Sequence, residues 1–243
     1  MKRALAALAV GAVLFAGGAG AGNAKLTVFA ASSLTNAFPK IDGSASYSFA
    51  GSNTLAAQIR QGAPADVFAA ANTALPNGLY RDHLCSRPVV FTRNTLVVIV
   101  PRSNPAGIHS IFDLRRAGVK LVIAGPGVPV GAYTLQVLRK MDLSGVLKNV
   151  VSRETDVREV LAKVALGEAD AGFVYSTDAQ TVPRKVRTLW IPAWGQPDVR
   201  YGLCVVAASP HRPTARAFVK RVLGPAGQRI LRSYGFLPLP KRR

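Results

Sequence analysis

The stretch "FAGSNTLAAQIRQGAPADVFAAA" (residues 49–71) contains two apolar segments that are separated by a helical pattern. Residues 53–62 carry apolar side chains at the spacing of one helix face, and Gly62 followed by Pro64 ends that pattern. Residues 65–71 are short and apolar, as in a buried strand. This strand–helix–strand order predicts parallel strand pairing, with the helix packed on a face of the sheet.

The same alternation extends in both directions along the chain. Strands are expected at 25–31, 44–50, 65–71, 95–101, 119–126, 170–179 and 201–209. Helices are expected at 53–62, 131–141, 156–169, 213–224 and 225–235. The pattern predicts an α/β chain with no obvious linker. It fits one large domain or two α/β lobes joined by strands that cross at 95–101 and 201–209.

The first 24 residues have the features of a secretory signal peptide. A basic start at Lys2 and Arg3 precedes an apolar run rich in small residues, and "GNA" at 22–24 offers a cleavage site after Ala24. We therefore expect this segment (1–24) to be removed, leaving an exported, periplasmic protein that begins at Lys25.

The chain is strongly basic. Its formal net charge is +19, and removal of Lys2 and Arg3 would leave +17. Such a surface attracts anions over roughly a Debye length. The basic residues are spread along the sequence without an aromatic-interleaved basic motif, so nucleic acid is not the expected partner.

Two cysteines, Cys85 and Cys204, have no metal-site spacing, and the three histidines are isolated. Because an exported chain favours disulfides, we expect these two cysteines to be bonded, with two buried free thiols as the alternative. The sequence also lacks a nucleophile elbow, a Walker loop and a zinc motif, so we expect no enzyme and no cofactor.

Hydroxyl groups and glycines recur where expected strands give way to helices. Ser32 and Ser33 follow "FAA", Ser52 follows "FAG", and Tyr175 ends the strand "GFVY". Helix starts present free N–H groups and the positive end of a dipole, so they bind anions without charged side chains. For any one of these serines, a simple helix cap is the plainer interpretation. Their repetition at strand ends favours an anion site.

Several segments, quoted in order, carry a resemblance to one family: "VFAASSLTNAF", the 49–71 stretch, "VPVGAY", "DVREVLAKVALGEADAGFVYSTDA" and "GPAGQRILRSYGF". Together they resemble the periplasmic molybdate-binding proteins that serve ABC transporters, over essentially all of residues 25–237. The resemblance implies a two-lobe periplasmic-binding-protein fold of type II, with mainly parallel sheets and a ligand cleft between the lobes. With crossings at the two apolar strands, lobe I comprises 25–98 plus 205–243 and lobe II comprises 99–204.

The resemblance also implies the ligand positions: Ser33 and Ser52 in the first lobe, and Val130, Val157 and Tyr175 in the second. The two valines would donate through backbone N–H groups only. Ser32 and Asn53 stand where family members often carry other residues, and they are additional candidate donors.

The function implied is capture of molybdate, and of tungstate, by a monomer that docks on a membrane permease. Two alternatives stay open from the sequence. One is a receptor for another oxyanion such as sulfate or phosphate, and the other is a basic exported protein that binds nucleic acid or an anionic surface.

Overall fold

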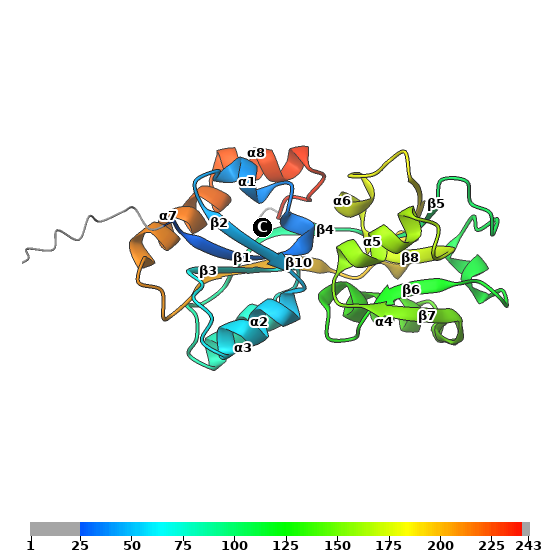
Figure 1. Ribbon diagram of the computed structural model, residues 1–243, viewed down its shortest axis with the longest axis horizontal. Coiled ribbons are helices and arrows are strands. Elements are labelled where there is room, and N and C mark those ends of the chain that lie inside the picture. Colours follow the sequence, from blue (N-terminus) through cyan, green and yellow to red (C-terminus); the bar gives the residue numbers. More distant parts are fainter. Residues whose placement is uncertain (1–24, 240–243) are drawn as a thin grey trace, which may run out of the picture.

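The computed structural model describes residues 25–239. The expected signal segment and its cleavage site therefore lie outside the described residues. Within the described part, the chain forms two α/β lobes that lie side by side, each built on one sheet with helices on both faces (Figure 1). The predicted two-lobe α/β organisation is confirmed.

In the described part of the chain, the first lobe contains a five-stranded sheet with the order β2-β1-β3-β10-β4. Its strands are β1 (Thr27–Ala31), β2 (Ser46–Ala50), β3 (Val67–Ala70), β4 (Val89–Asn94) and β10 (Val199–Val205). Strand β1 pairs in parallel with β2 and β3, whereas β10 runs antiparallel to β3 and β4.

The second lobe, again counting only described residues, contains a five-stranded sheet with the order β7-β6-β8-β5-β9. Its strands are β5 (Leu96–Pro101), β6 (Leu121–Ala124), β7 (Val150–Glu154), β8 (Ala171–Tyr175) and β9 (Val186–Trp190). Strand β6 pairs in parallel with β7 and β8, whereas β5 runs antiparallel to β8 and β9.

Both sheets are therefore mixed, but four of the five described strands in each run in the same direction, and β10 or β5 alone runs against them. The prediction of mainly parallel sheets is confirmed, with one antiparallel strand in each that it did not include. The reason is the direction from which the chain enters each sheet. Strand β5 begins opposite Tyr175, the last residue of β8, and β10 reaches Ala70, the last residue of β3, at its central residue Gly202. A strand that arrives from the other lobe enters at the carboxyl edge of the parallel strands, so it must run against them.

The chain passes between the sheets at Thr95 and again between Trp190 and Val199. The boundaries expected from the sequence, 98/99 and 204/205, fall inside β5 and β10. Each of these apolar strands lies wholly in one sheet, and the crossings occupy the short segments before them.

Helices cover both faces of each sheet (Figure 1). In the first lobe they are α1 (Phe38–Ile41), α2 (Ser52–Arg60), α3 (Ala74–Arg81), α7 (Arg212–Leu223) and α8 (Pro225–Ser233). In the second lobe they are α4 (Pro129–Lys140), α5 (Val157–Ala165) and α6 (Ser176–Ala179). Short 3₁₀ helices are η1 (Ser32–Leu34), η2 (Ile111–Arg115), η3 (Ser144–Asn149) and η4 (Ala193–Gly195). None of the helices within 25–239 has the length and hydrophobicity needed to cross a bilayer.

Alternation along β1 shows how the sheet is buried on both faces. Val28 and Ala30 belong to the large hydrophobic core, while Phe29 points to the opposite face and packs with Leu55 and Ile59 of α2. Successive strand residues point to opposite faces, so a strand covered by helices on both sides must be apolar throughout.

Cys85 and Cys204 are free thiols in this structure, so the predicted disulfide is wrong. The register explains why. Cys85 pairs with Val206, which places it diagonal to Cys204 and not opposite it. Diagonal neighbours across antiparallel strands have Cα atoms ~7–8 Å apart, beyond the ~4.4–6.8 Å typical of disulfides. The adjacent Cys85 thiol, together with burial, raises the pKa of Cys204.

We predict that neither thiol reacts with a thiol reagent in the native protein, because Cys85 is 5% exposed and Cys204 is 2% exposed. Unfolding in denaturant without reductant should release both thiols. Titration with a chromogenic disulfide reagent before and after unfolding makes this measurement. Two thiols that stay unreactive after unfolding would mean that the cysteines are bonded.

Candidate functional site

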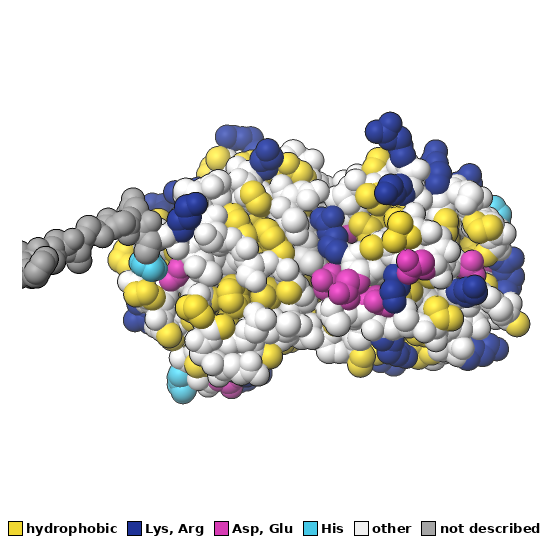
Figure 2. All heavy atoms as spheres, in the orientation of Figure 1, with side chains coloured by type: hydrophobic (Ala, Val, Ile, Leu, Met, Phe, Trp, Pro, Cys, Tyr) yellow, Lys and Arg dark blue, Asp and Glu magenta, His cyan; other side chains and the backbone are white. Residues whose placement is uncertain are grey.

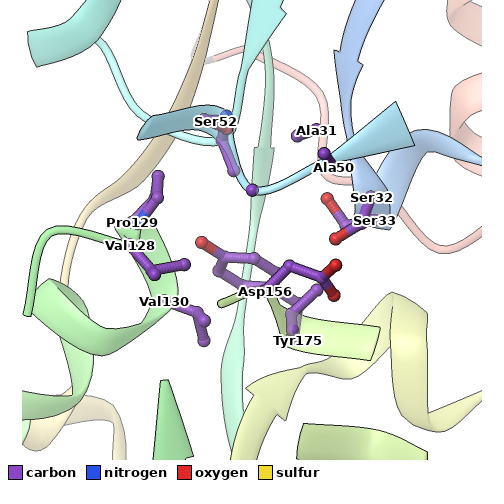
Figure 3. A pocket seen from close by; sticks show the side chains of 13 residues that line it. Ala31, Ser32, Ser33, Ala50, Ser52, Val128, Pro129, Val130, Asp156 and Tyr175 are labelled. Atoms are coloured by element: carbon purple, nitrogen blue, oxygen red, sulfur yellow. Dashed lines mark hydrogen bonds between the residues drawn. The ribbon is translucent and has the colours of Figure 1, made fainter. Parts of the chain in front are cut away.

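A small pocket lies between the two lobes, at the carboxyl ends of strands from both sheets (Figure 3). Its free volume is about 10 Å³, roughly enough for one water-sized group, so it suits a small ion and not a drug-sized ligand. The residues that line it are Ala31, Ser32, Ser33, Ala50, Gly51, Ser52, Ala71, Val128, Pro129, Val130, Asp156, Val157 and Tyr175.

Strand register brings these segments together. Ala31 pairs with Ala50, so β1 and β2 end side by side and their following turns enter the pocket next to one another. In the second lobe Ala124 pairs with Glu154, and the segments after β6 and β7 reach the pocket in the same way. Ligands bind at this edge of open α/β sheets because the strand-to-helix turns converge there.

Two helix starts present backbone donors to the pocket. Helix α4 has Pro129 at its first position, which has no N–H, so the N–H of Val130 is the first that this helix offers. At α5 the Asp156 carboxylate accepts hydrogen bonds from the N–H groups of Arg158 and Glu159, at 2.6 and 3.2 Å. This cap leaves the N–H of Val157 at the helix start.

Ser33 and Ser52 are both buried, and each has an oxygen engaged with a neighbour on the protein side. The oxygen of Ser52 accepts a hydrogen bond from the N–H of Ala71 at 3.1 Å. Ser33 Oγ lies 2.9 Å from the hydroxyl of Tyr201. An Ala71 N–H can only donate, so the hydrogen of the Ser52 hydroxyl remains for a ligand.

Tyr175 supplies the hydroxyl of the second lobe. Its side chain is 1% exposed, and its hydroxyl has no hydrogen-bond partner among the described residues. Figure 3 shows the labelled serines on one side of the pocket and Tyr175 facing them across it. Burial raises the pKa of this phenol well above its ordinary value, so it keeps its proton and donates. An unpaired buried hydroxyl costs ~1–3 kcal/mol, which a bound acceptor would recover.

The positive charge of the protein does not line the pocket. Among the described lining residues, Asp156 is the charged one, and no lysine or arginine is present. Lysine and arginine side chains lie scattered over both lobes in Figure 2, and a group of acidic side chains lies at the junction. Direct contacts to a ligand would thus come from neutral groups.

An ion pair lies behind the pocket. Arg158 Nε is 3.0 Å from the carboxylate of Asp178, which is fully buried, although the two atoms lack hydrogen-bond geometry. Burial raises the pKa of Asp178 to about 7, against the lowering effect of Arg158. Asp178 is therefore harder to ionise than an exposed aspartate, although Arg158 favours its charged form.

The comparisons with known proteins agree with this geometry. Residues 26–237 match the family described as bacterial extracellular solute-binding protein. The chain is 39% identical to the molybdate-binding protein ModA of Mycobacterium tuberculosis, covering 88% of this chain and 85% of the relative. The chain belongs to the ModA family of bacterial extracellular solute-binding proteins.

Solved structures show the fold. The periplasmic molybdate-binding protein of Azotobacter vinelandii superposes with a TM-score of 0.78 at 22% identity, covering 89% of this chain and 100% of that one. The sulfate-binding protein SubI of M. tuberculosis gives 0.79 at 19% identity, covering 89% and 88%. Since proteins named for two different ions fit almost equally well, the fold does not identify the ion.

The structure brings the five expected ligand positions of this ModA family member to one pocket: Ser33, Ser52, Val130, Val157 and Tyr175. Ser32 also lines it. Asn53 does not, and its side-chain oxygen is buried without a partner among the described residues. Two residues that contact the site indirectly, Tyr201 and Asn94, were missed. Neither stands at a strand-to-helix junction, and only the tertiary contacts reveal them.

Gly51 sets how closely the lobes approach. A Cβ atom placed on Gly51 would overlap the carbonyl oxygen of Thr155, which belongs to the second lobe. The side-chain oxygen of Asn53 would lie only 2.9 Å from that Cβ. A glycine is therefore required here for the lobes to close as they do in this structure.

We predict that Gly51→Ala weakens oxyanion binding at least ~10-fold, because overpacking of ~1–3 kcal/mol falls on the closed arrangement. Thermal stability without ligand should change little, since the clash with backbone, at Thr155, is between lobes. The matched control is Gly145→Ala in the second lobe, where an added Cβ has no neighbour within 4 Å. Calorimetric titration with molybdate measures both variants, and equal affinities would contradict the role assigned to Gly51.

Proposed function

We propose that this protein captures molybdate, and also tungstate, and delivers it to the permease of an ABC transporter. The observation that carries the proposal is the buried, unpartnered hydroxyl of Tyr175, which faces neutral donors of the other lobe across a pocket of ionic size. The ion would receive hydroxyl groups from Ser33, Ser52 and Tyr175 and N–H groups from Val130 and Val157. Ser32 is a candidate sixth donor.

Neutral donors are sufficient because several charge-assisted hydrogen bonds converge on one dianion. Each contributes roughly 1.5–3 kcal/mol, and the helix starts add the positive ends of their dipoles. Closure of the two lobes would remove water from the ion and complete the donor set. The surrounding positive surface would raise the rate of encounter and would not contact the ion.

The protein would act outside the cytoplasm. Membership in the extracellular solute-binding family supports export, and the features of residues 1–24 support a signal peptide removed after Ala24. We further propose that it works as a monomer that docks on a membrane permease.

The proposal is tested by calorimetric titration of the purified protein with molybdate, tungstate, sulfate and phosphate at neutral pH. We expect molybdate and tungstate to bind at least about a hundredfold more tightly than phosphate, which retains a proton that the five donor positions named above leave unmatched. Tightest binding of sulfate would instead favour a sulfate receptor. Absence of binding to all four ions would refute an oxyanion function.

Tyr175→Phe keeps the ring and removes one donor to the buried ion. We predict a loss of ~1.5–3 kcal/mol, or about 10- to 150-fold in molybdate affinity. Ser176→Ala is the control, because the Ser176 hydroxyl donates to Asn94 at 3.3 Å and does not line the pocket. If Ser176→Ala weakens binding more than Tyr175→Phe, the ligand lies at a different strand end.

A further inference from the structure

A chain of buried hydrogen bonds leads from Ser33 across the first lobe to the second. The Tyr201 hydroxyl lies 2.9 Å from Ser33 Oγ, and Asn94 Nδ2 lies 3.2 Å from the same hydroxyl. Asn94 Nδ2 also donates to Thr177 Oγ1 at 2.9 Å. All four side chains are at most 5% exposed. Tyr201 lies on β10, and Asn94 is the last residue of β4, immediately before the crossing at Thr95.

The direction of these hydrogen bonds is fixed by the backbone. The N–H of Thr95 donates to Asn94 Oδ1 at 2.8 Å, and a backbone N–H cannot accept, so the oxygen and nitrogen of the Asn94 amide are assigned. The amide nitrogen uses its two hydrogens on Thr177 and Tyr201. Tyr201 therefore accepts from Asn94.

The hydrogen of the Tyr201 hydroxyl has one destination. Among residues 25–239, Ser33 Oγ is the other atom at hydrogen-bond distance from it, and the Asn94 nitrogen cannot accept. Tyr201 thus donates to Ser33. A serine oxygen that accepts from inside the protein has its own hydrogen left over, and Ser33 lines the pocket.

We propose that Tyr201, oriented by Asn94, is a positioning residue that makes Ser33 a hydrogen-bond donor to the bound ion and so selects fully deprotonated oxyanions. The proposal rests on the oxyanion function proposed above and extends it to specificity. The Ser52 oxygen likewise accepts from the N–H of Ala71, so the hydroxyls of Ser33 and Ser52 both have a hydrogen left to donate and accept one poorly.

The consequence is a penalty for any ion that carries a proton. Hydrogen phosphate has an O–H that needs an acceptor, and a serine whose oxygen is already engaged by Tyr201 accepts it poorly. Removing the Tyr201 hydroxyl frees the Ser33 oxygen, so the serine can turn and accept. Loss of Tyr201 should therefore affect protonated and deprotonated ions in opposite directions.

The test is Tyr201→Phe in the full chain, titrated with molybdate, tungstate and inorganic phosphate at neutral pH. We expect molybdate and tungstate to bind about 3- to 10-fold more weakly, because one donor becomes mobile, while phosphate binds as tightly as before or more tightly. The ratio of molybdate to phosphate affinity should fall at least about fivefold. Phosphate is measured by displacement of molybdate if its direct signal is small.

Two controls separate positioning from general damage. Tyr47→Phe deletes the same atom in the same lobe, where the hydroxyl donates to the carbonyls of Phe38 and Asp42 away from the pocket, and it should leave the ratio unchanged. A double-mutant cycle with Ser33→Ala tests the route. If Tyr201 acts through Ser33, then Tyr201→Phe should not change the ratio further when Ser33 is already alanine.

The outcomes are distinct. A wild-type protein that binds none of the ions refutes the proposed function itself. Wild-type binding with equal losses for all three ions in Tyr201→Phe refutes the selectivity role and leaves the function standing. A ratio that changes equally with and without Ser33 refutes the route through Ser33. Thermal unfolding of each variant confirms that it is folded under the conditions of titration.

Discussion

The buried hydroxyl of Tyr175 has no hydrogen-bond partner within residues 25–239, and the other groups of the site are arranged around the same need for an acceptor. A polar hydrogen that faces a dry pocket is unfavourable unless something accepts it, and the described residues provide no acceptor. Its position follows from β8, which ends at Tyr175 in the middle of the second sheet and is held there by β5 and β6. The sheet cannot retract this side chain without disturbing the core. The hydroxyl of Tyr175 therefore remains an unpaired donor in the pocket between the two lobes.

The first-lobe side of the pocket also presents hydrogen-bond donors. Ser52 accepts from the backbone and Ser33 accepts from Tyr201, so the protein side of each serine is occupied by a donor. The helix starts at Val130 and Val157 add backbone hydrogens, and Asp156 is turned to its own helix as a cap. A pocket whose groups mostly present hydrogens, with the Asp156 carboxylate as the exception, suits a small anion that has acceptors in several directions. The need for a lysine or arginine in the pocket disappears because the donors are many and fixed.

Much of this could be predicted from the sequence because it depends on short-range patterns. The strand at 65–71 and the helix at 53–62 follow from apolar spacing, and the resemblance pointed to the same five ligand positions that line the pocket. Helix α3 was missed because Pro76 and Gly78 lie inside it, and both residues usually interrupt helices. Strand β7 was missed because its residues are only partly buried and include Arg153 and Glu154.

The remainder depends on register and tertiary contact, which spacing alone does not encode. A shift of two residues along β10 decides whether Cys85 faces Cys204 or Val206, and nothing local to either cysteine reports it. Tyr201 lies in an apolar strand, so the sequence indicates a core residue, and the structure confirms that it is buried. Its hydroxyl acquires a role only because Ser33 and Asn94, distant in sequence, meet it.

The fold is nearly equally similar to a molybdate-binding and a sulfate-binding structure, so details within the site, and not the fold, must determine which ion is bound. Two features can then set it: how closely the lobes close, which Gly51 governs, and which way the hydroxyl hydrogens point. The second is decided several hydrogen bonds away from the ligand, where the Thr95 N–H fixes the Asn94 amide and, through it, the Tyr201 hydroxyl. A binding site made of serines is chemically ambivalent, since each hydroxyl can donate or accept. It becomes selective for a deprotonated ion only when the surrounding protein removes the choice.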